Sequence, residues 1–190
     1  MLARRRGDDA GAADDALANF LPRTIGGFVM HTFLALTMLG VLYCGVGTAF
    51  ADDVPDASKT PGLARAGLSK AKICATKWGK DERHVTQAMK DQVFSLYGYS
   101  GYQDRRCVPD QNGKTCEIDH LISREVGGAD DVSNLWPQAY GSTPWNAHLK
   151  DKLENRLHKE LCNGNITLQE ARDSLTNDWR IAYRKYYGDP

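Results

Sequence analysis

The chain has no excess of charge of either sign, since its 190 residues include 24 Lys plus Arg and 24 Asp plus Glu. Residues 52–190 taken alone are balanced as well, with 20 of each kind. Tight nonspecific binding of nucleic acid draws much of its free energy from neutralised phosphates and released counterions. The balance therefore argues against that class of protein, unless basic side chains are gathered locally or binding is weak and serves catalysis.

Residues 25–51 lack Asp, Glu, Lys and Arg altogether, and they include an apolar run from Phe33 to Tyr43. The segment ends in Ala49-Phe50-Ala51, a small-x-small pattern typical of a secretory cleavage site. We interpret residues 1–51 as a signal peptide with an overlong n-region. This predicts a secreted or periplasmic protein with no stable membrane association after cleavage. The alternative is an uncleaved anchor, because the uncharged run is long enough to span a bilayer.

Paired C-x-x-C knuckles, a common mark of structural zinc sites, are also missing. Four cysteines follow residue 51, and an even number in an exported chain favours two disulfides. Cys107 and Cys116 flank a turn sequence, Pro109–Gly113, so we expect them to close a hairpin. Cys74 would then pair with Cys162. A four-cysteine zinc site is the rival interpretation.

Composition divides the rest of the chain into two parts. Residues 52–72 are rich in Ala, Gly, Ser, Pro and charge, which predicts a flexible lead-in. Residues 73–188 have the composition and length of one small domain. Apolar residues at helical spacing predict a helix over residues 81–97 and helical segments over 166–179 and 179–187.

The densest group of chemically active residues runs from Glu117 to Gly128, with the sequence EIDHLISREVGG. Asp119 and His120 are adjacent, so on an extended strand their side chains point to opposite faces. Gly127-Gly128 supplies turn residues that end this first strand. The segment Asn134–Pro137 then predicts a short second strand that proline stops.

A helix is predicted after this second strand. Four leucines recur there at a strict four-residue spacing that fits one helix face, at positions 149, 153, 157 and 161. We expect the helix to run from about Pro144 to Cys162, with Thr143-Pro144 at its cap and first turn and Asn163-Gly164 at its end. The predicted unit is strand, loop, strand and helix, within an α+β domain that is mainly helical and disulfide-stapled.

The order Asp-His, Gly-Gly, Asn-Leu and helix resembles the HNH, or ββα-metal, endonuclease motif. More narrowly, the chain resembles a group of small bacterial secreted HNH-type proteins in five segments, Asp119–Ile122, Glu125–Gly128, Asn134–Gln138, Lys150–Asn155 and Leu161–Gly164. The resemblance covers roughly residues 74 to 188. It implies a metal-dependent endonuclease acting on nucleic acid, with DNA expected ahead of RNA, and it identifies no immunity or inhibitor protein.

The resemblance also implies roles for individual residues. His120 would be the general base that deprotonates water, Asp119 a metal ligand, and Asn134 a residue that fixes the loop and so orients His120. The family's helix ligand would fall at Ala147, which cannot bind a metal ion. Polar neighbours are the substitutes, first His148 and Asp151, which share a helix face, and then Asn146 and Asn155.

The ligand types bear on the metal. Oxygen ligands favour Mg²⁺ or Mn²⁺, whereas His148 as a ligand favours Zn²⁺ or Ni²⁺. The ion would polarise the phosphate and stabilise the leaving oxygen while His120 accepts a proton from water.

Basic residues are the candidates for substrate contacts, and they are Arg124, Lys150, Arg105 and Arg106. The last two accompany a run of tyrosines, Tyr97, Tyr99 and Tyr102. Aromatic and basic side chains together can stack on bases and bind the phosphates of single strands. The alternative is a Tyr-rich loop that packs on the domain.

Two interpretations from other classes compete with the nuclease. A catalytically inactive HNH-like scaffold would bind nucleic acid or protein without turnover, and the missing helix ligand and the neutral charge favour it. A disulfide-stapled envelope protein would use Asp119 and His120 only as a buried structural pair.

Overall fold

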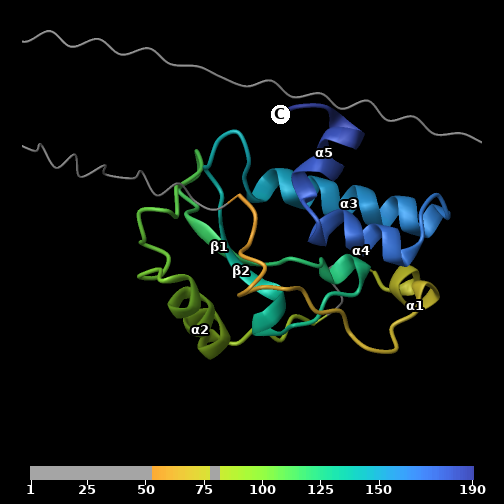
Figure 1. Cartoon of the computed structure of the whole chain (residues 1–190), viewed down its shortest axis with the longest axis horizontal. Coiled ribbons are helices and arrows are strands. Elements are labelled where there is room, and N and C mark those ends of the chain that lie inside the picture. Colours follow the sequence, from red (N-terminus) through yellow and green to blue (C-terminus); the bar gives the residue numbers. More distant parts are fainter. Residues whose placement is uncertain (1–52, 78–81) are drawn as a thin grey trace, which may run out of the picture. The chain divides into compact units, whose positions relative to one another are not determined.

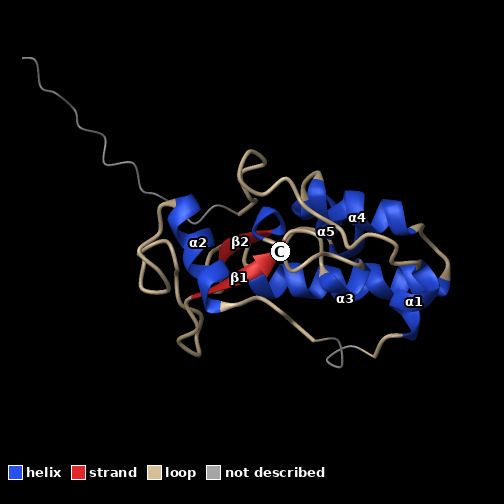
Figure 2. Cartoon of the chain, turned by 90° about the horizontal axis from the view of Figure 1, so that it is seen from below, coloured by secondary structure: helices blue, strands red, loops and turns tan. Residues whose placement is uncertain are grey.

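A computed structural model describes residues 53–77 and 82–190. Within these ranges the fold is α+β, with five α-helices, one two-stranded antiparallel sheet and two disulfides. The strands lie between α2 (Gln87–Tyr97) and the three helices that follow them in sequence (Figure 1, Figure 2). The predicted signal peptide lies outside the described residues. No helix in the described part of the chain is both long and apolar enough to cross a membrane.

The sheet is a hairpin of β1 (Cys116–His120) and β2 (Leu135–Ala139). Its second strand is longer than predicted, because Pro137 lies inside β2 opposite Ile118 and does not stop it. Backbone hydrogen bonds beyond both ends of the ladder place Ile118 and Pro137 in a non-hydrogen-bonded pair. Proline is tolerated there because its missing N–H would point away from the partner strand.

The site helix is α3 (Ala147–Asn163), and it begins three residues later than predicted. Its cap is Asn146, whose side-chain oxygen accepts a hydrogen bond from the Leu149 N–H at 3.1 Å, so the predicted Thr143-Pro144 cap is wrong. Gly164 ends the helix with a φ of 82°, a left-handed conformation that favours glycine.

The other helices follow the predicted order with shifted bounds. α2 begins at Gln87, after a Thr86 side chain that caps Met89, and not at residue 81, which is outside the described ranges. α4 (Leu168–Thr176) begins with a capping box formed by Thr167 and Glu170, and α5 (Trp179–Tyr187) is a separate helix. The chain re-forms a helix there because the Asp178 side chain caps the Arg180 N–H.

Two apolar clusters flank the hairpin. One lies between α2 and the strands and contains Ile118, Leu135 and Trp136. The other lies among α1 (Lys70–Ala75), α3, α4 and α5, with Trp145 packed edge-on against Trp179 at 5.4 Å between ring centroids. Because strand side chains alternate, Ile118 faces the first cluster while its polar neighbours along β1 face α3.

The segment before α1 packs on the domain, which differs from the flexible lead-in that its composition predicts. Thr60 is fully buried, and its hydroxyl donates to the Leu135 carbonyl oxygen at 2.8 Å. Ala64 forms a β-bridge with Gly128, and the Trp179 indole N–H donates to the Asp53 carbonyl oxygen. These backbone partners lie far away in sequence, so composition alone does not reveal them.

Both predicted disulfides are confirmed. Cys74–Cys162 joins α1 to α3, and Cys107–Cys116 joins the loop after α2 to β1. Two disulfides in a domain of this size fit an extracellular or otherwise oxidising compartment.

Candidate active site

A cavity of about 150 Å³ opens between the hairpin and α3. It is lined by charged and polar side chains from β1, α3, η1 (Arg124–Val126) and the segment before α2, namely Arg83, Glu117, Asp119, His120, Ser123, Arg124, Asp151 and Glu154. The structure therefore brings together four of the predicted site residues, His120, Asp119, Asp151 and Arg124.

Beside the cavity, the Lys150 ammonium is completely buried. Its Nζ donates to Asp119 Oδ2 and to the His120 carbonyl oxygen, each at 2.6 Å, and it also contacts Glu154 Oε1. Burial lowers the pKa of Lys150, but the Asp119 and Glu154 carboxylates outweigh this effect, so the pKa lies above its ordinary value. Lys150 is thus a fixed, buried cation. It is not exposed to a substrate, so the substrate contact predicted for it does not fit its position.

Asp119 has a donor on each carboxylate oxygen, because Oδ1 accepts a hydrogen bond from the His120 backbone N–H at 2.7 Å. These two bonds fix its orientation. A carboxylate oxygen has a second lone pair, so each oxygen keeps room for one further partner.

His120 is buried and pairs with Asp130, a residue of the loop between the two strands. Its Nε2 lies 2.7 Å from Asp130 Oδ1. Asp130 Oδ2 in turn accepts a hydrogen bond from the His84 backbone N–H at 2.6 Å, and Arg124 Nε lies 3.8 Å from Oδ1. With a carboxylate as its partner, Nε2 carries the proton and Nδ1 is left as the basic nitrogen.

Electrostatics set the protonation of this pair. Burial lowers the pKa of His120 to about 4, although the neighbouring Asp119 and Asp130 carboxylates act in the opposite direction. Burial raises the pKa of Asp130, but hydrogen bonds from His84 and His120 outweigh it, so the pKa lies below its ordinary value. At neutral pH the dyad is therefore a neutral imidazole held by a carboxylate.

The cavity wall is strongly acidic. Burial raises the pKa of Glu117 to about 8, and the Asp119 and Asp151 carboxylates add to the increase. Burial, with repulsion from Asp119, also raises the pKa of Asp151. For Glu154, burial raises the pKa to about 8 despite the attraction of Lys150. Glu117 Oε2 accepts a hydrogen bond from the Tyr140 hydroxyl at 2.7 Å, while its buried Oε1 has no hydrogen-bond partner among the described residues.

These oxygens suit a hard divalent cation, which would lower the raised pKa values of Glu117 and Asp151 and so favour their ionised forms. They do not form a compact cage. Within residues 53–77 and 82–190, only Cys74, His158 and Cys162 form a set of three His, Cys, Asp or Glu ligand atoms within 4.8 Å of one another. The cavity therefore fits an Mg²⁺ or Mn²⁺ ion that keeps most of its water and contacts one or two carboxylates.

Several predicted residues lie elsewhere. His148 Nε2 contacts Asp110 Oδ2 at 3.0 Å, and the His148 side chain is 48% exposed and not part of the cavity lining. Asn146 is used as the α3 cap, and Asn155 donates to the Asp151 carbonyl oxygen within the helix. Of the helix ligands considered, Asp151 is the one at the cavity.

Arg105 and Arg106 belong to the loop between α2 and β1, away from the cavity lining. Arg106 is held by Asp104, with 2.8 Å between Nε and Oδ1, and its guanidinium stacks on Tyr99 at 3.7 Å from the ring centroid. Tyr97 and Tyr99 are buried. The packing interpretation of the Tyr-rich loop describes these residues better than base stacking.

Asn134 closes the loop between the strands, as its predicted role requires. Its Oδ1 accepts hydrogen bonds from the Ile122 N–H at 2.9 Å and the Leu63 N–H at 3.2 Å. Its Nδ2 donates to the carbonyl oxygens of Ile122 and Ala129. The Ala129 bond places Asn134 next to Asp130, and so links the loop to the partner of His120.

Sequence reasoning missed four members of the site, Glu117, Asp130, Glu154 and Arg83. Two of them had a signal in the sequence. Glu117 is two residues from Asp119 on the same strand face, and Glu154 is one helical turn from Lys150. Asp130 and Arg83 had none, because they reach the site from a turn and from the segment before α2.

Comparisons of the chain with protein-family models, curated proteins and solved structures give no match.

Proposed function

We propose that this protein is an exported, metal-dependent endonuclease that hydrolyses phosphodiester bonds of DNA or RNA. The observation that carries the proposal is the His120–Asp130 dyad, a neutral buried imidazole on a carboxylate at the wall of a cavity rich in acidic side chains. A base that is neutral at pH 7 is ready to accept a proton, and this is the first requirement for activating water.

In the proposed reaction, His120 Nδ1 accepts a proton from a water molecule as its oxygen attacks the phosphorus atom. Asp130 holds the imidazole in the required tautomer and stabilises the imidazolium that forms. Arg124, which lines the cavity 3.8 Å from Asp130, is the cation placed to contact a phosphate oxygen.

One or two of the carboxylates of Glu117, Asp119 and Asp151 would hold the divalent ion, with water as its remaining ligands. When bound, the ion supplies charge neutralisation at the phosphate and at the leaving oxygen. Lys150 fixes Asp119 through its bond to Oδ2, so the carboxylate keeps its position whether or not a substrate is bound.

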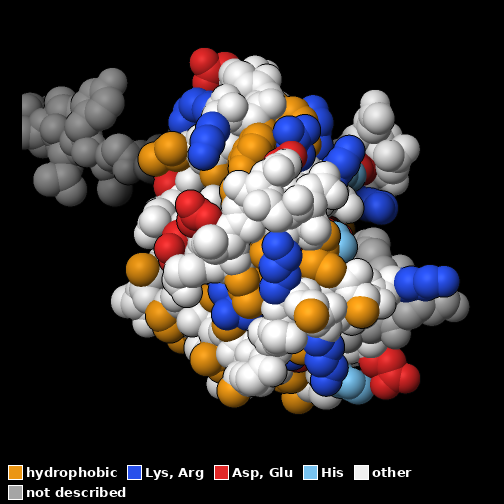
Figure 3. All heavy atoms as spheres, turned by 90° about the vertical axis from the view of Figure 1, so that its right-hand side faces the viewer, with side chains coloured by type: hydrophobic (Ala, Val, Ile, Leu, Met, Phe, Trp, Pro, Cys, Tyr) orange, Lys and Arg blue, Asp and Glu red, His pale blue; other side chains and the backbone are white. Residues whose placement is uncertain are grey.

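The distribution of basic side chains on one face agrees with a weak, catalytic mode of binding. Basic side chains are spread over the face shown in Figure 3, where apolar and acidic side chains separate them. Two disulfides and the apolar run at residues 33–43 support a secreted or periplasmic location.

The test is cleavage of plasmid, single-stranded DNA and RNA by the exported, oxidised chain, with EDTA or with Mg²⁺, Mn²⁺, Zn²⁺ or Ni²⁺. Metal-dependent cleavage that His120→Ala abolishes supports the proposal. His84→Ala is the matched control. His84 contacts Asp130 through its backbone N–H, which the substitution keeps, and the His84 side chain is 73% exposed. Equal loss in both variants would point to misfolding instead of chemistry.

The second candidate is a scaffold that binds nucleic acid or protein without turnover. The observation that favours it is Lys150, because a fixed ammonium at Asp119 already neutralises the carboxylate that a metal ion would need. A folded, disulfide-intact chain that cleaves none of these substrates with any of these ions would support the scaffold.

A further inference from the structure

The joint between α1 and α3 combines a disulfide with a histidine. Cys74 lies one residue before the end of α1, and Cys162 lies one residue before the end of α3. His158 precedes Cys162 by one helical turn, on the same face of α3, and its Nε2 lies 3.5 Å from Cys162 Sγ. None of these three residues lines the cavity of the proposed active site.

The three side chains offer a metal-ligand set. One ligand atom from each of Cys74, His158 and Cys162 lies within 4.8 Å of the others, and all three residues are half-buried. Two thiolates and one imidazole are a known ligand set for Zn²⁺ that leaves the fourth position for water or another ligand. The sulfur atoms are joined in the structure, so they can bind an ion only after reduction.

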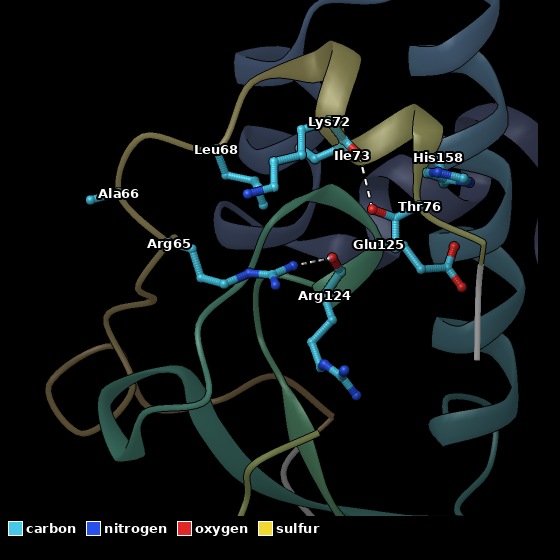
Figure 4. A pocket seen from close by; sticks show the side chains of 9 residues that line it. All are labelled: Arg65, Ala66, Leu68, Lys72, Ile73, Thr76, Arg124, Glu125 and His158. Carbon is cyan, nitrogen blue, oxygen red and sulfur yellow. Dashed lines mark hydrogen bonds between the residues drawn. The ribbon is translucent and has the colours of Figure 1, made fainter. Parts of the chain in front are cut away.

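An open fourth position is consistent with the surroundings of His158. A hollow of about 390 Å³ reaches His158, and it is also lined by Lys72, Ile73 and Thr76 at the end of α1 and by Arg124 and Glu125 of η1. Figure 4 shows His158 on α3 facing this end of α1, with Thr76 beside it. An ion held by the three ligands would therefore have room for water on the side of the hollow.

We infer that the Cys74–Cys162 pair has a second state, in which the reduced thiolates and His158 bind a thiophilic divalent ion such as Zn²⁺. A dithiol reductant supplies two electrons and two protons, which breaks the S–S bond, and the reductant is oxidised to its own disulfide. Binding of the ion then releases the two thiol protons as two metal–sulfur bonds and one metal–nitrogen bond form. The inference does not depend on the proposed nuclease activity.

The two disulfides differ in a way that makes selective reduction possible. Cys107 and Cys116 are 4% and 7% exposed, whereas Cys74 and Cys162 are half-buried. A reductant in solution therefore reaches the α1–α3 pair first.

The consequence is a cross-link that survives reduction. α1 has six residues and buries only Ile73, so its attachment to α3 depends strongly on the link between the two helices. An ion bound by Cys74, Cys162 and His158 would restore that link when the disulfide opens.

The experiment is a titration with Co²⁺, a spectroscopic probe for tetrahedral zinc sites. The sample is the exported chain after selective reduction. Alkylation and mass mapping first verify that Cys74 and Cys162 are reduced while Cys107–Cys116 is intact. We expect one Co²⁺ per chain, with a sulfur-to-cobalt charge-transfer band and tetrahedral d–d bands. We also expect Zn²⁺ to displace the Co²⁺ and to raise the Tm of the reduced chain.

Two variants separate this site from adventitious binding. His158→Ala retains the disulfide, so its fold can be checked in the oxidised state, and we expect its reduced form to bind Zn²⁺ roughly 100-fold more weakly, since even outer-shell partners are worth 10–100-fold. Cys74→Ala/Cys162→Ala keeps only the other disulfide, and we expect no charge-transfer band. Absence of the bands in a folded, selectively reduced chain, or unchanged bands in His158→Ala, would overturn the inference.

Discussion

Lys150 Nζ lies 2.6 Å from Asp119 Oδ2, and the lysine side chain has no exposure to solvent. A lysine buried in this way is rare unless it is paired. Here the ammonium also bonds to the His120 carbonyl oxygen and to Glu154, so all three of its donors have oxygen partners. The contact locks α3 onto β1 at the residues on which the proposed chemistry depends.

Replacement of Lys150 by Met should destabilise the protein strongly. The change leaves the buried Asp119 carboxylate without its cation and removes the hydrogen bond to Glu154, and removal of one partner from a buried ion pair costs about 3–5 kcal/mol. Urea denaturation at pH 7 measures the loss. Lys159→Met, at an exposed position on the same helix, is the control and should change the free energy of unfolding by less than about 0.5 kcal/mol. A loss of less than 1 kcal/mol in Lys150→Met would contradict the buried ion pair.

Asp130→Asn should impair the proposed base without removing it. The amide cannot stabilise an imidazolium, so we expect cleavage to fall by roughly 10- to 100-fold, as for other partners that orient a functional histidine. The pKa of His120 should fall further below about 4, because the Asp130 carboxylate acts to raise it. NMR of the imidazole nitrogens reports both tautomer and pKa. An unchanged tautomer and pKa would show that Asp130 does not position His120.

The strand-loop-strand-helix order could be predicted because its signals are local. Leucines 153, 157 and 161 give the buried face of α3, Gly164 ends it, and turn residues separate the strands. The start of α3 could not be predicted as well, because Asn146 and Thr143 both have side chains that can cap a helix. Only packing decides which of them does so.

The candidate site was predictable where its residues are neighbours in sequence or share an element face. Asp119 and His120 meet because they are adjacent on β1, and Asp151 joins them from α3. The partner of His120 could not be predicted, because Asp130 reaches it only after the loop closes around Asn134. The burial of Lys150 also escaped prediction, since a lysine on a charged helix is expected to face solvent.

Asn134→Ala should loosen the loop that carries Asp130. Asn134 is fully buried, and its loss leaves the N–H groups of Leu63 and Ile122 and the carbonyl of Ala129 without this partner. We expect the free energy of unfolding to fall by about 2–4 kcal/mol, since each buried polar group left unsatisfied costs about 1–3 kcal/mol.

Asn155→Ala is the matched control for Asn134→Ala. Its side chain is exposed and bonds only to a carbonyl of its own helix, so its effect should stay below about 0.5 kcal/mol. Hydrogen exchange would locate the loss, with faster exchange at Ile122 in Asn134→Ala alone. Equal stability of the two variants would argue against a structural role for the Asn134 amide.

Stability should fall as the pH rises from about 6.5 to 8. The pKa values of Glu117 and Glu154 are raised to about 8 in the folded protein from an ordinary 4.5, so the folded state binds these protons more tightly. That contribution is fully present below pH 4.5 and is lost as the pH rises through 8. His120 has the opposite effect, because its pKa in the folded protein, about 4, lies below the ordinary 6.5. Its contribution to stability therefore grows as the pH rises from about 4 to 6.5 and is constant above that. Above 6.5 the two carboxyl groups therefore act without this opposition.

Thermal unfolding at constant ionic strength measures how the Tm changes with pH. Added Mg²⁺ tests whether the carboxyl groups of the cavity cause that change. A cation bound in the cavity lowers the pKa of each carboxyl group around it, so saturating Mg²⁺ should flatten the fall in Tm between pH 6.5 and 8. Glu117→Gln should remove part of the slope without any ion, because its amide does not titrate. A slope that is the same with Mg²⁺, without it and in Glu117→Gln would mean that the fall arises elsewhere, and that Mg²⁺ does not bind at this cavity.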